Sequence, residues 1–367
     1  MATTSYASAD NQTAKRWGND LYAEALRQSV IGLLAGKGED AFFQIRDDFK
    51  EGQKGDLVRV QLDTQLSGDG RQGSEPLEGF EEAHVSYTQD LTINEIRHAT
   101  SEEGGISYQR QAADYSIRER AKNKLADWWE QKFDTSFLNQ ACSNTVADDT
   151  NTKNTGNNAV TAFSTDQRYL TGAANVQSLA AGDEFTLDHI VAAIAKGKTF
   201  NRADGTGDPL RPGKIFGKRC YVCIIHPLQA RDLKTSTSTN GMAELAKAFF
   251  QGMGDNNPIA KGYFMGGTEV VGYWHNTLIL ENARIPYGID ESDGTYETDT
   301  RSAVLLGAQA VVGAFAKGND LERMKWVEKT FDFDQYTAVA AMCIYGMVKA
   351  RWNSVDHGVI QIPTYAV

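Results

Sequence analysis

The spacing of apolar side chains predicts one unusually long helix in the first half of the chain. Between Ile106 and Asn144 no glycine or proline interrupts a stretch rich in alanine, leucine and charged residues. Apolar side chains recur there every three to four positions, which places them on one face of a helix. They are Ile117, Ala121, Leu125, Trp128, Trp129, Phe133 and Phe137. Six charged residues fall mostly off that face: Arg118, Glu119, Lys122, Lys124, Glu130 and Lys132.

A helix of this length needs a comparably long surface against its apolar face. At 1.5 Å per residue it would extend roughly 50 Å, more than the diameter of a small domain. We therefore expect a sheet to lie along it. An amphipathic helix of an ordinary enzyme would give the same local pattern.

Residues 55–99 instead show the period of two that is typical of β-strands. Val58, Val60 and Leu62 alternate with polar residues, and the same alternation returns at Val85, Tyr87, Leu91 and Ile93. The connecting residues 66–82 contain several glycines and a proline, which prevent regular structure. The pattern predicts a long hairpin with an irregular tip. Because an isolated two-stranded ribbon is only marginally stable, we expect a partner surface, in an assembly another subunit, to cover its apolar face.

Shorter helices are expected on both sides of these elements. Residues 1–18 have no periodicity and predict an extended or mobile arm, followed by a helix from a cap at Asn19 or Asp20 to Gly36 or Gly38. Thr186 resembles the cap of another helix, and Pro227 can open a third. Residues 242–250 suggest a fourth, whereas residues 148–182 read as irregular loop and residues 204–217 as a boundary.

The last third of the chain is apolar without a clear period. Residues 303–316 and 336–348 could form either helix or strand, but residues 358–362 predict a strand that fixes the C-terminus in a sheet. Residues 290–299 form an acidic loop whose spacing fails the calcium pattern of an EF-hand, so we interpret it as a solvated loop.

Composition limits the class of protein. The chain has 367 residues, of which 41% are hydrophobic and 23% charged, enough for a sizeable core. Its net charge of -11 disfavours a protein whose main task is to grip nucleic-acid phosphates, since that requires lysine and arginine. The chain offers no apolar run of membrane-spanning length and no secretory signal, so we expect synthesis and folding in the cytoplasm.

Motifs for chemistry are missing from the sequence. It has no phosphate-binding glycine loop, nucleophile elbow or zinc-protease helix. The six histidines are scattered singly, and we expect packing or hydrogen-bonding roles for them. Cys220 and Cys223 have the spacing of a metal-binding pair, but they lie in an apolar strand pattern without a second pair, which favours a structural role. We therefore predict no catalytic site, cofactor or metal.

Several short segments, in their order, resemble the major capsid proteins of tailed phages, specifically the podophage-type branch. Each is only a turn or packing pattern, but their order and spacing cover nearly the whole chain. In the first half they are Gly55-Asp56, Leu66-Ser67-Gly68-Asp69-Gly70, Leu77-Glu78-Gly79-Phe80-Glu81-Glu82, Ile96-Arg97-His98-Ala99 and Leu125-Ala126-Asp127-Trp128. In the second half they are Pro209-Leu210-Arg211-Pro212, His226-Pro227-Leu228-Gln229-Ala230, Asn257-Pro258-Ile259 and Gly358-Val359-Ile360.

The resemblance implies an α+β chain with the HK97-like phage capsid fold. Its parts would be an N-terminal arm at residues 1–46, an extended hairpin called the E-loop at 47–99, and a peripheral domain with a long spine helix at 100–212. An axial domain would follow at 213–285, and residues 286–367 would return to the peripheral domain. The spine helix itself would span about residues 107–139.

The same resemblance implies a non-catalytic protein that assembles with itself. Expected partners are copies of the chain in hexameric and pentameric capsomers, a scaffolding protein, a portal and a decoration protein, with double-stranded DNA on the inner face and no membrane. We expect the hairpin tip, which has little apolar surface, to contact a neighbouring subunit through its charges. The expected contact residues are Asp69, Arg71, Glu78, Glu81 and Glu82. As the one cation among acids, Arg71 would meet a carboxylate across the boundary.

Two other functions remain compatible with the sequence. An encapsulin-like compartment would share the fold and store enzymes, and a soluble α+β enzyme could assemble its site from distant residues. One family variant is disfavoured, because residues 55–99 contain no lysine and so cannot supply the lysine of a Lys–Asn isopeptide cross-link.

Overall fold

The computed structural model describes residues 21, 29–46, 57–63, 70–81, 86–103, 117–148, 152–164, 167–199, 209–215, 217–235, 264–265, 268–316, 324–333, 336–352 and 354–367. Four of the expected features lie outside these residues. They are the arm at 1–18, the helix cap at Asn19 or Asp20, the beginning of the long helix at 106–116 and the helix at 242–250.

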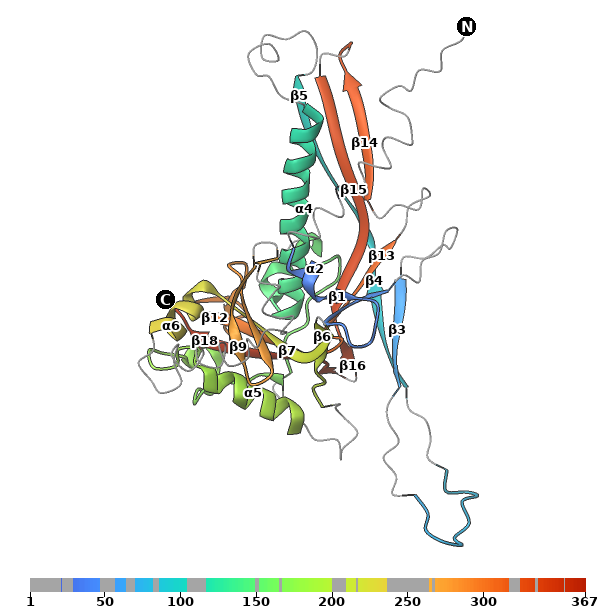
Figure 1. Cartoon of the computed structure of the whole chain (residues 1–367), viewed down its shortest axis with the longest axis vertical. Coiled ribbons are helices and arrows are strands. Elements are labelled where there is room, and N and C mark those ends of the chain that lie inside the picture. The colour runs from blue at the N-terminus through green and yellow to red at the C-terminus, as the bar shows by residue number, and fades with distance from the viewer. Residues whose placement is uncertain are drawn as a thin grey trace.

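The first sheet has six strands and carries the long helix along one face. Its strand order is β1-β2-β13-β15-β14, and β5 pairs with β15 as well. The bounds are β1 Ala35–Gly36, β2 Phe43–Arg46, β5 Asn94–Glu103, β13 Val311–Ala316, β14 Met324–Phe331 and β15 Tyr336–Lys349. Helix α4, Ile117–Ala141, runs beside β5, β15 and β14 in an elongated tower (Figure 1). The sheet expected along the long helix is therefore present.

Helix α4 packs on this sheet through the apolar face that the sequence predicts, with two corrections. Ala121, Leu125, Trp129, Phe133 and Phe137 are buried in the main core. Trp128, expected on that face, is only half-buried and stacks on the His98 ring with centroids 4.2 Å apart. Glu130, expected off that face, is nevertheless buried, and Arg284 pairs with its carboxylate.

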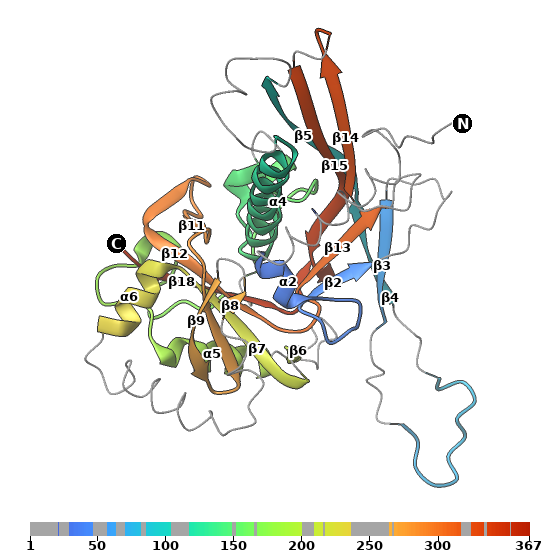
Figure 2. The same ribbon diagram turned by 45° about the horizontal axis from the view of Figure 1, so that its top comes forward.

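The second sheet has eight strands and forms a second body beside the tower (Figure 2), and one face of this sheet shares the main core with α4. Its order is β11-β12-β7-β10-β9-β8, with β18 on β12 and β6 on β7. The bounds are β6 Gly213–Ile215, β7 Lys218–Ile225, β8 Phe264–Met265, β9 Thr268–Trp274, β10 Thr277–Glu281, β11 Tyr287–Ile289, β12 Tyr296–Leu306 and β18 Val359–Tyr365. The expected strand at 220–225 is confirmed, and it is buried throughout. The C-terminal strand is confirmed too.

The helices of this second body begin where the sequence predicts. Helix α5, Leu187–Thr199, follows Thr186, and Pro227 opens α6, Pro227–Thr235. Their apolar residues form a second core with β7, β12 and β18. The acidic loop is shorter than expected because β12 begins at Tyr296. Within the loop, the Asp290 carboxylate accepts a hydrogen bond from the Ser292 N–H, and the Asp293 carboxylate accepts one from the Thr295 N–H.

The helix expected up to Gly36 or Gly38 is not continuous. Ser29 has extended backbone angles, φ -86 and ψ 145, and caps the short helix α2, Val30–Leu34. Its Oγ accepts a hydrogen bond from the Ile31 backbone N–H at 3.0 Å. The sequence pattern missed this break because the apolar spacing continues through it.

Both ambiguous apolar stretches form strands, with a turn at 307–310 between β12 and β13, and β15 explains the ambiguity. Its alternate residues Val339, Ala341, Cys343 and Tyr345 are buried in the core with α4, whereas the residues between them are half-buried and also apolar. Such a strand has no polar face to reveal the period of two.

The projecting hairpin is confirmed, but its base is covered by its own chain. Strands β3, Leu57–Asp63, and β4, Ser86–Thr92, pair antiparallel with Val60 opposite Gln89. The apolar side chains Val58, Val60 and Leu91 pack on Val312, Ala314, Ala316, Ala350 and Trp352. The expected partner surface for the hairpin base is therefore this chain's own first sheet with the short strand β16, Arg351–Trp352, which pairs with β17, Val355–Asp356. The described residues also include the 3-10 turns η1 Thr145–Asp148, η2 Thr152–Asn154 and η4 Val176–Ser178.

Each of the two sheets is built from segments that lie far apart in the sequence. Residues 94–103 pair with β15, so the end of the expected E-loop belongs to the first sheet. Residues 287–306 and 359–365 lie in the second sheet, so only the middle of the stretch 286–367 returns to the first. Strand pairing between distant segments decides which sheet a residue joins, and local sequence patterns do not reveal that pairing.

The hairpin approaches β15 so closely that one position there must be glycine. A Cβ on Gly346 would collide with the backbone carbonyl oxygen of Thr92. We expect Gly346→Ala to lower the free energy of unfolding by roughly 1–3 kcal/mol, as overpacking does. Chemical denaturation measures it, with Gly38→Ala as the control, since that Cβ would meet nothing closer than 3.9 Å. Equal stability of the two variants would contradict this close approach.

Candidate functional site

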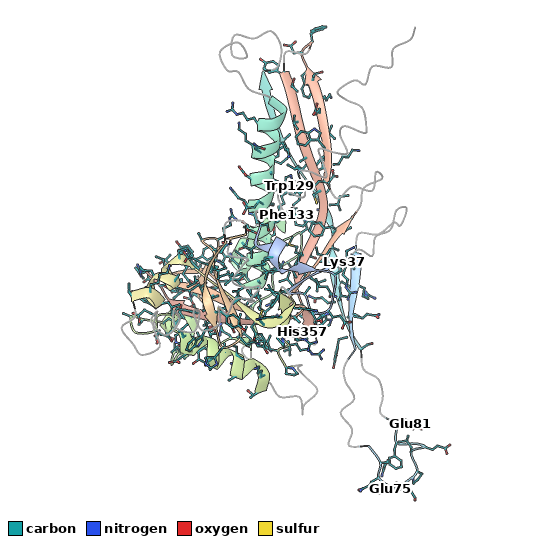
Figure 3. The ribbon with its side chains drawn as sticks, in the orientation of Figure 1. Lys37, Glu75, Glu81, Trp129, Phe133 and His357 are labelled. Carbon is teal, nitrogen blue, oxygen red and sulfur yellow. The ribbon has the colours of Figure 1, made fainter. Side chains whose placement is uncertain are left out.

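The hairpin tip, residues 70–81, is exposed throughout and lies at the far end of the hairpin (Figure 3). Gly70, Gly73 and Gly79 have positive φ angles of 72°, 66° and 87°, which L side chains rarely adopt. Among the described residues, the hydrogen bonds, ion pair and ring contact of the tip all join tip residues to one another. The tip therefore has a defined local shape. The bonds and contacts that hold this shape come from within the tip and not from the rest of the described chain.

Three of the five expected contact residues lie in this tip. Arg71, Glu78 and Glu81 are exposed, while Asp69 and Glu82 lie outside the described residues. Arg71 already has a carboxylate partner in its own tip, with its Nη1 3.2 Å from Glu75 Oε2. The Oε2 of Glu81 accepts a hydrogen bond from the Gly79 N–H at 2.9 Å. A carboxylate of another subunit is thus not needed to pair Arg71.

The tip also presents apolar surface, contrary to expectation. Leu77 and Phe80 are each 60% exposed, and the Arg71 guanidinium lies 3.6 Å from the centre of the Phe80 ring. The stacked cation holds this ring in place at the surface. Charged residues dominate the sequence of the tip and hide these two side chains, although an apolar pair within an exposed turn was the available signal.

A second group of exposed aromatic residues lies at the end of the tower, where β14 turns into β15. Phe331 and Tyr336 are 46% and 42% exposed, and Phe333 is fully exposed. Asp332 and Phe333 have positive φ angles of 50° and 51°. A bulky residue is strained in this conformation, and it keeps the conformation when other interactions favour it.

The hairpin strands carry one well-formed surface ion pair. Arg59 on β3 and Asp90 on β4 are directly opposite, with Nε to Oδ1 at 2.7 Å and Nη2 to Oδ2 at 3.0 Å. The hydrogen bond from Arg59 lowers the pKa of the Asp90 carboxyl. Because both groups are solvated, this pair fixes the register of the strands more than it stabilises the fold.

A buried ionic cluster joins three parts of the chain. Arg284, in the turn between β10 and β11, donates to Glu130 Oε1 at 2.6 Å and to Asp134 Oδ2 at 3.0 Å, both on α4. Asp134 Oδ1 also accepts from Ser29 Oγ at 2.5 Å and from the Val30 N–H at 3.0 Å. Burial is the main cause that raises the pKa of Asp134, to about 7, and Glu130 adds to it. The cluster connects the second sheet, α4 and α2.

A second buried ion pair joins the end of β15 to β17. Lys349 Nζ is 2.9 Å from Asp356 Oδ1, and both side chains are almost completely buried. Lys349 also donates to Ser143 Oγ and to the Thr161 carbonyl oxygen, and lies over the Phe163 ring. Burial lowers the pKa of Lys349 to about 8. These contacts tie the end of β15 to the segment after α4.

The cysteines and several histidines have packing roles, as predicted. The four cysteines are free and buried, and burial raises the thiol pKa of Cys220 to about 11. His189 shares a hydrogen bond with Thr171, and His226 accepts one from the Leu228 N–H. His357, labelled in Figure 3, packs against Trp352. Within the described ranges no three or more of these residue types group as metal ligands, and no helix there could cross a membrane.

Comparison with known proteins identifies the family. The family model described as phage capsid protein matches residues 3–367. The major capsid protein of Pseudomonas phage KPP25 is 24% identical over 385 residues, which cover 98% of this chain and 96% of that protein.

Solved structures share the fold. The capsid of Ralstonia phage GP4 aligns over 100% of this chain and 99% of that chain, with a TM-score of 0.77 and 26% identity. The capsid of cyanophage Pam1 aligns over 93% of both chains, with a TM-score of 0.65 and 18% identity. The fold is thus the HK97-like phage capsid fold in an α+β chain, and these relatives are phage capsids rather than enzyme-storing compartments. The chain therefore belongs to the phage capsid protein family and is a major capsid protein, a structural component of the phage virion.

Proposed function

We propose that copies of this chain form hexameric and pentameric capsomers of an icosahedral shell around double-stranded DNA, and that the hairpin tip joins neighbouring copies. The observation that carries the second part is the tip itself. It combines exposed Leu77 and Phe80 with charged Arg71, Glu78 and Glu81, and its described contacts are internal. A shaped apolar surface so far from its own core is the kind of surface that a partner covers.

The parts of the fold have proposed places in this shell. The first sheet with α4 would be the peripheral domain and α4 its spine helix. The second sheet with α5 and α6 would be the axial domain near capsomer centres, and β3, β4 and the tip would be the E-loop. This assignment rests on the strand pairing of the two sheets, and it replaces the boundary at residue 285 by sheet membership.

Further partners follow from the proposed shell. We propose a scaffolding protein during assembly in the host cytoplasm, a portal at one vertex and a decoration protein outside. DNA would lie against the inner face without sequence-specific binding. The net charge of -11 supports this last point, because an acidic wall holds phosphates weakly.

Particle mass tests the shell. Material purified from phage should sediment as closed particles of megadalton mass, and micrographs should show icosahedral outlines. Recovery of this chain chiefly as a stable monomer or dimer from phage would contradict the proposal. Expression without a scaffolding protein is a weaker test, since capsomers or misassembled shells would also result.

Shortening the tip tests the role of the hairpin. Replacing residues 68–79 by a tight glycine-containing turn should leave circular dichroism and subunit melting nearly unchanged, because the tip packs on no described part of the core. Shells should fail to form or should break at lower temperature. The double variant Leu77→Ser, Phe80→Ser should act in the same direction without changing the chain length.

The matched control for the tip is Ser74→Ala, at an exposed tip residue without a described contact to the apolar pair. It should assemble like the natural chain. Normal shells from the shortened protein, with normal size and heat resistance, would show that this hairpin does not join the subunits.

A further inference from the structure

Strands β4 and β5 are nearly one continuous strand with a joint at Ile93. Above the joint, β5 pairs with β15 through a regular ladder that ends at Asn94 opposite Tyr345. Below the joint, β4 pairs with β3, and in the described strand pairing it has no ladder with β15. The backbone of the hairpin therefore leaves the first sheet at this point.

Side-chain amides take the place of the ladder where the two strands separate. Asn157 donates from Nδ2 to the Tyr345 carbonyl oxygen at 2.7 Å and lies 3.4 Å from that of Asn94. Asn158 accepts from the Thr92 N–H at 2.9 Å, and its Nδ2 lies 2.9 Å from the Thr92 carbonyl oxygen and 3.1 Å from that of Met347. The side-chain amide of Asn158 both donates and accepts hydrogen bonds. It therefore bonds to both strands in the way that the peptide group of an inserted strand would.

A third amide connects the strands again farther down the hairpin. Gln89 on β4 donates from Nε2 to the Lys349 carbonyl oxygen at 2.8 Å, and its Oε1 accepts from the Arg351 N–H at 2.8 Å. We call Gln89, Asn157 and Asn158 the amide clasp.

The turn that carries Asn157 and Asn158 is itself held by the end of α4. Gln140 donates from Nε2 to the Thr155 carbonyl oxygen at 2.6 Å and lies 3.1 Å from that of Asn158. Its Oε1 accepts from the Lys349 N–H at 3.2 Å. The Met347 N–H donates to Gly156, whose positive φ of 71° and lack of a side chain permit this approach. A rigid chain of contacts therefore runs from α4 through the turn to the hairpin.

We propose that the amide clasp sets the angle at which the hairpin leaves the first sheet, and that its three residues are positioning residues for the contact between subunits. A continuous backbone ladder would hold the hairpin in the plane of the sheet. The clasp replaces it with bonds from one short turn and from Gln89. The apolar packing of the hairpin base holds the hairpin against the sheet, and the three amides fix its direction there. The inference rests on the proposed function in one respect, that the hairpin tip is the element which must reach a neighbouring copy.

The test measures the hairpin angle before assembly. Spin labels on Gln61→Cys in β3 and Asn123→Cys in α4, both exposed positions, report the distance between hairpin and helix in the full-length unassembled subunit. The four natural cysteines are buried, which leaves the two new thiols for labelling. We expect Asn158→Ala to broaden or shift the distance distribution relative to the natural residue, and to reduce the yield of closed shells.

A matched control separates positioning from loss of stability. Gln229 is a buried amide in the second body, whose Nε2 donates to the Arg301 carbonyl oxygen and to Thr364 Oγ1. Gln229→Ala should lower the melting temperature by an amount similar to Asn158→Ala but leave the distance distribution narrow. Should Asn158→Ala fail to fold, Gln89→Ala, on the hairpin itself, is expected to give the same broadening.

An unchanged, narrow distribution in folded Asn158→Ala or Gln89→Ala would overturn the proposal, whatever happens to melting or assembly. The shortened tip described above should keep the natural distribution even where shells fail. If the tip had no role in assembly, the distance measurement would still test the amide clasp. The proposed role of the tip and the proposed role of the clasp can therefore fail separately.

Discussion

Trp129→Ala is expected to lower the free energy of unfolding by about 3–5 kcal/mol, the range for emptying a large aromatic site in a core. Trp129 is fully buried in the middle of α4, with ring centroids 5.4 Å from Phe133 and 6.4 Å from Tyr345 (Figure 3). Phe133 in turn contacts Tyr345 and Phe315 across the sheet. The rings fill the space between helix and sheet, so neighbours cannot close the cavity. Urea denaturation of the unassembled subunit measures the change.

The adjacent tryptophan supplies the control. Trp128 is half-buried at the edge of the core and stacks on His98, so Trp128→Ala removes less buried surface than Trp129→Ala, and we expect a loss of about 1 kcal/mol. Leu125→Ala, at a fully buried position, should fall between about 2 and 5 kcal/mol. If the two tryptophan variants melt alike, the face of α4 against the sheet is wrongly assigned.

The pair Trp128 and Trp129 also shows what a local sequence pattern can predict and what it cannot. The period of α4 predicts which face is apolar, but adjacent positions differ by only 100° around a helix, so two neighbouring tryptophans cannot be ranked. The hairpin was predictable because β3 has one polar face, and β7 because it is a short apolar run. Strand β15 was not, since it is apolar on both faces and its period is hidden.

The candidate site was predictable only in part, for a related reason. Composition located an exposed, glycine-rich tip and its charges, but the pairing of Arg71 with Glu75 and Phe80 depends on how three positive-φ glycines fold the turn. The amide clasp joins Gln89, Asn157 and Asn158 to residues up to 262 positions away. Nothing in the local pattern around an asparagine in an irregular loop reveals such a partner.

The ionic cluster on α4 is a further long-range feature, and removing its cation is expected to have a large effect. Arg284 lies 154 positions from Glu130 and 150 from Asp134. Arg284→Met leaves two carboxylates close together in the core, and breaking one side of a buried pair costs about 3–5 kcal/mol. Because the Arg284 side chain is 32% exposed, we expect the lower end, about 3 kcal/mol at pH 8. Chemical denaturation at pH 5 and at pH 8 measures this loss in the free energy of unfolding.

The sign of the pH dependence follows from the raised pKa of Asp134. The folded chain holds a proton on this carboxyl up to about pH 7, whereas an ordinary Asp releases it near 3.8. Between these values the folded state binds more protons, so this group's contribution to stability falls as pH rises, by on the order of 4 kcal/mol over three pKa units. At pH 5 Asp134 is neutral, and Arg284→Met should therefore cost less than at pH 8.

Asp134→Asn tests the assignment of this pH dependence to one residue. An asparagine keeps an oxygen for the Ser29 hydroxyl and the Val30 N–H but cannot ionise, so it imitates the protonated acid. The stability advantage of the natural chain over this variant should shrink as pH rises from 5 to 8. Ser29→Ala, which removes one neutral donor to the same carboxyl, should instead raise the pKa of Asp134 further, because that hydrogen bond lowers it. A constant difference between the natural chain and Asp134→Asn across this range would show that Asp134 is already ionised in the folded chain at pH 5, and that it pairs with Arg284 as a carboxylate.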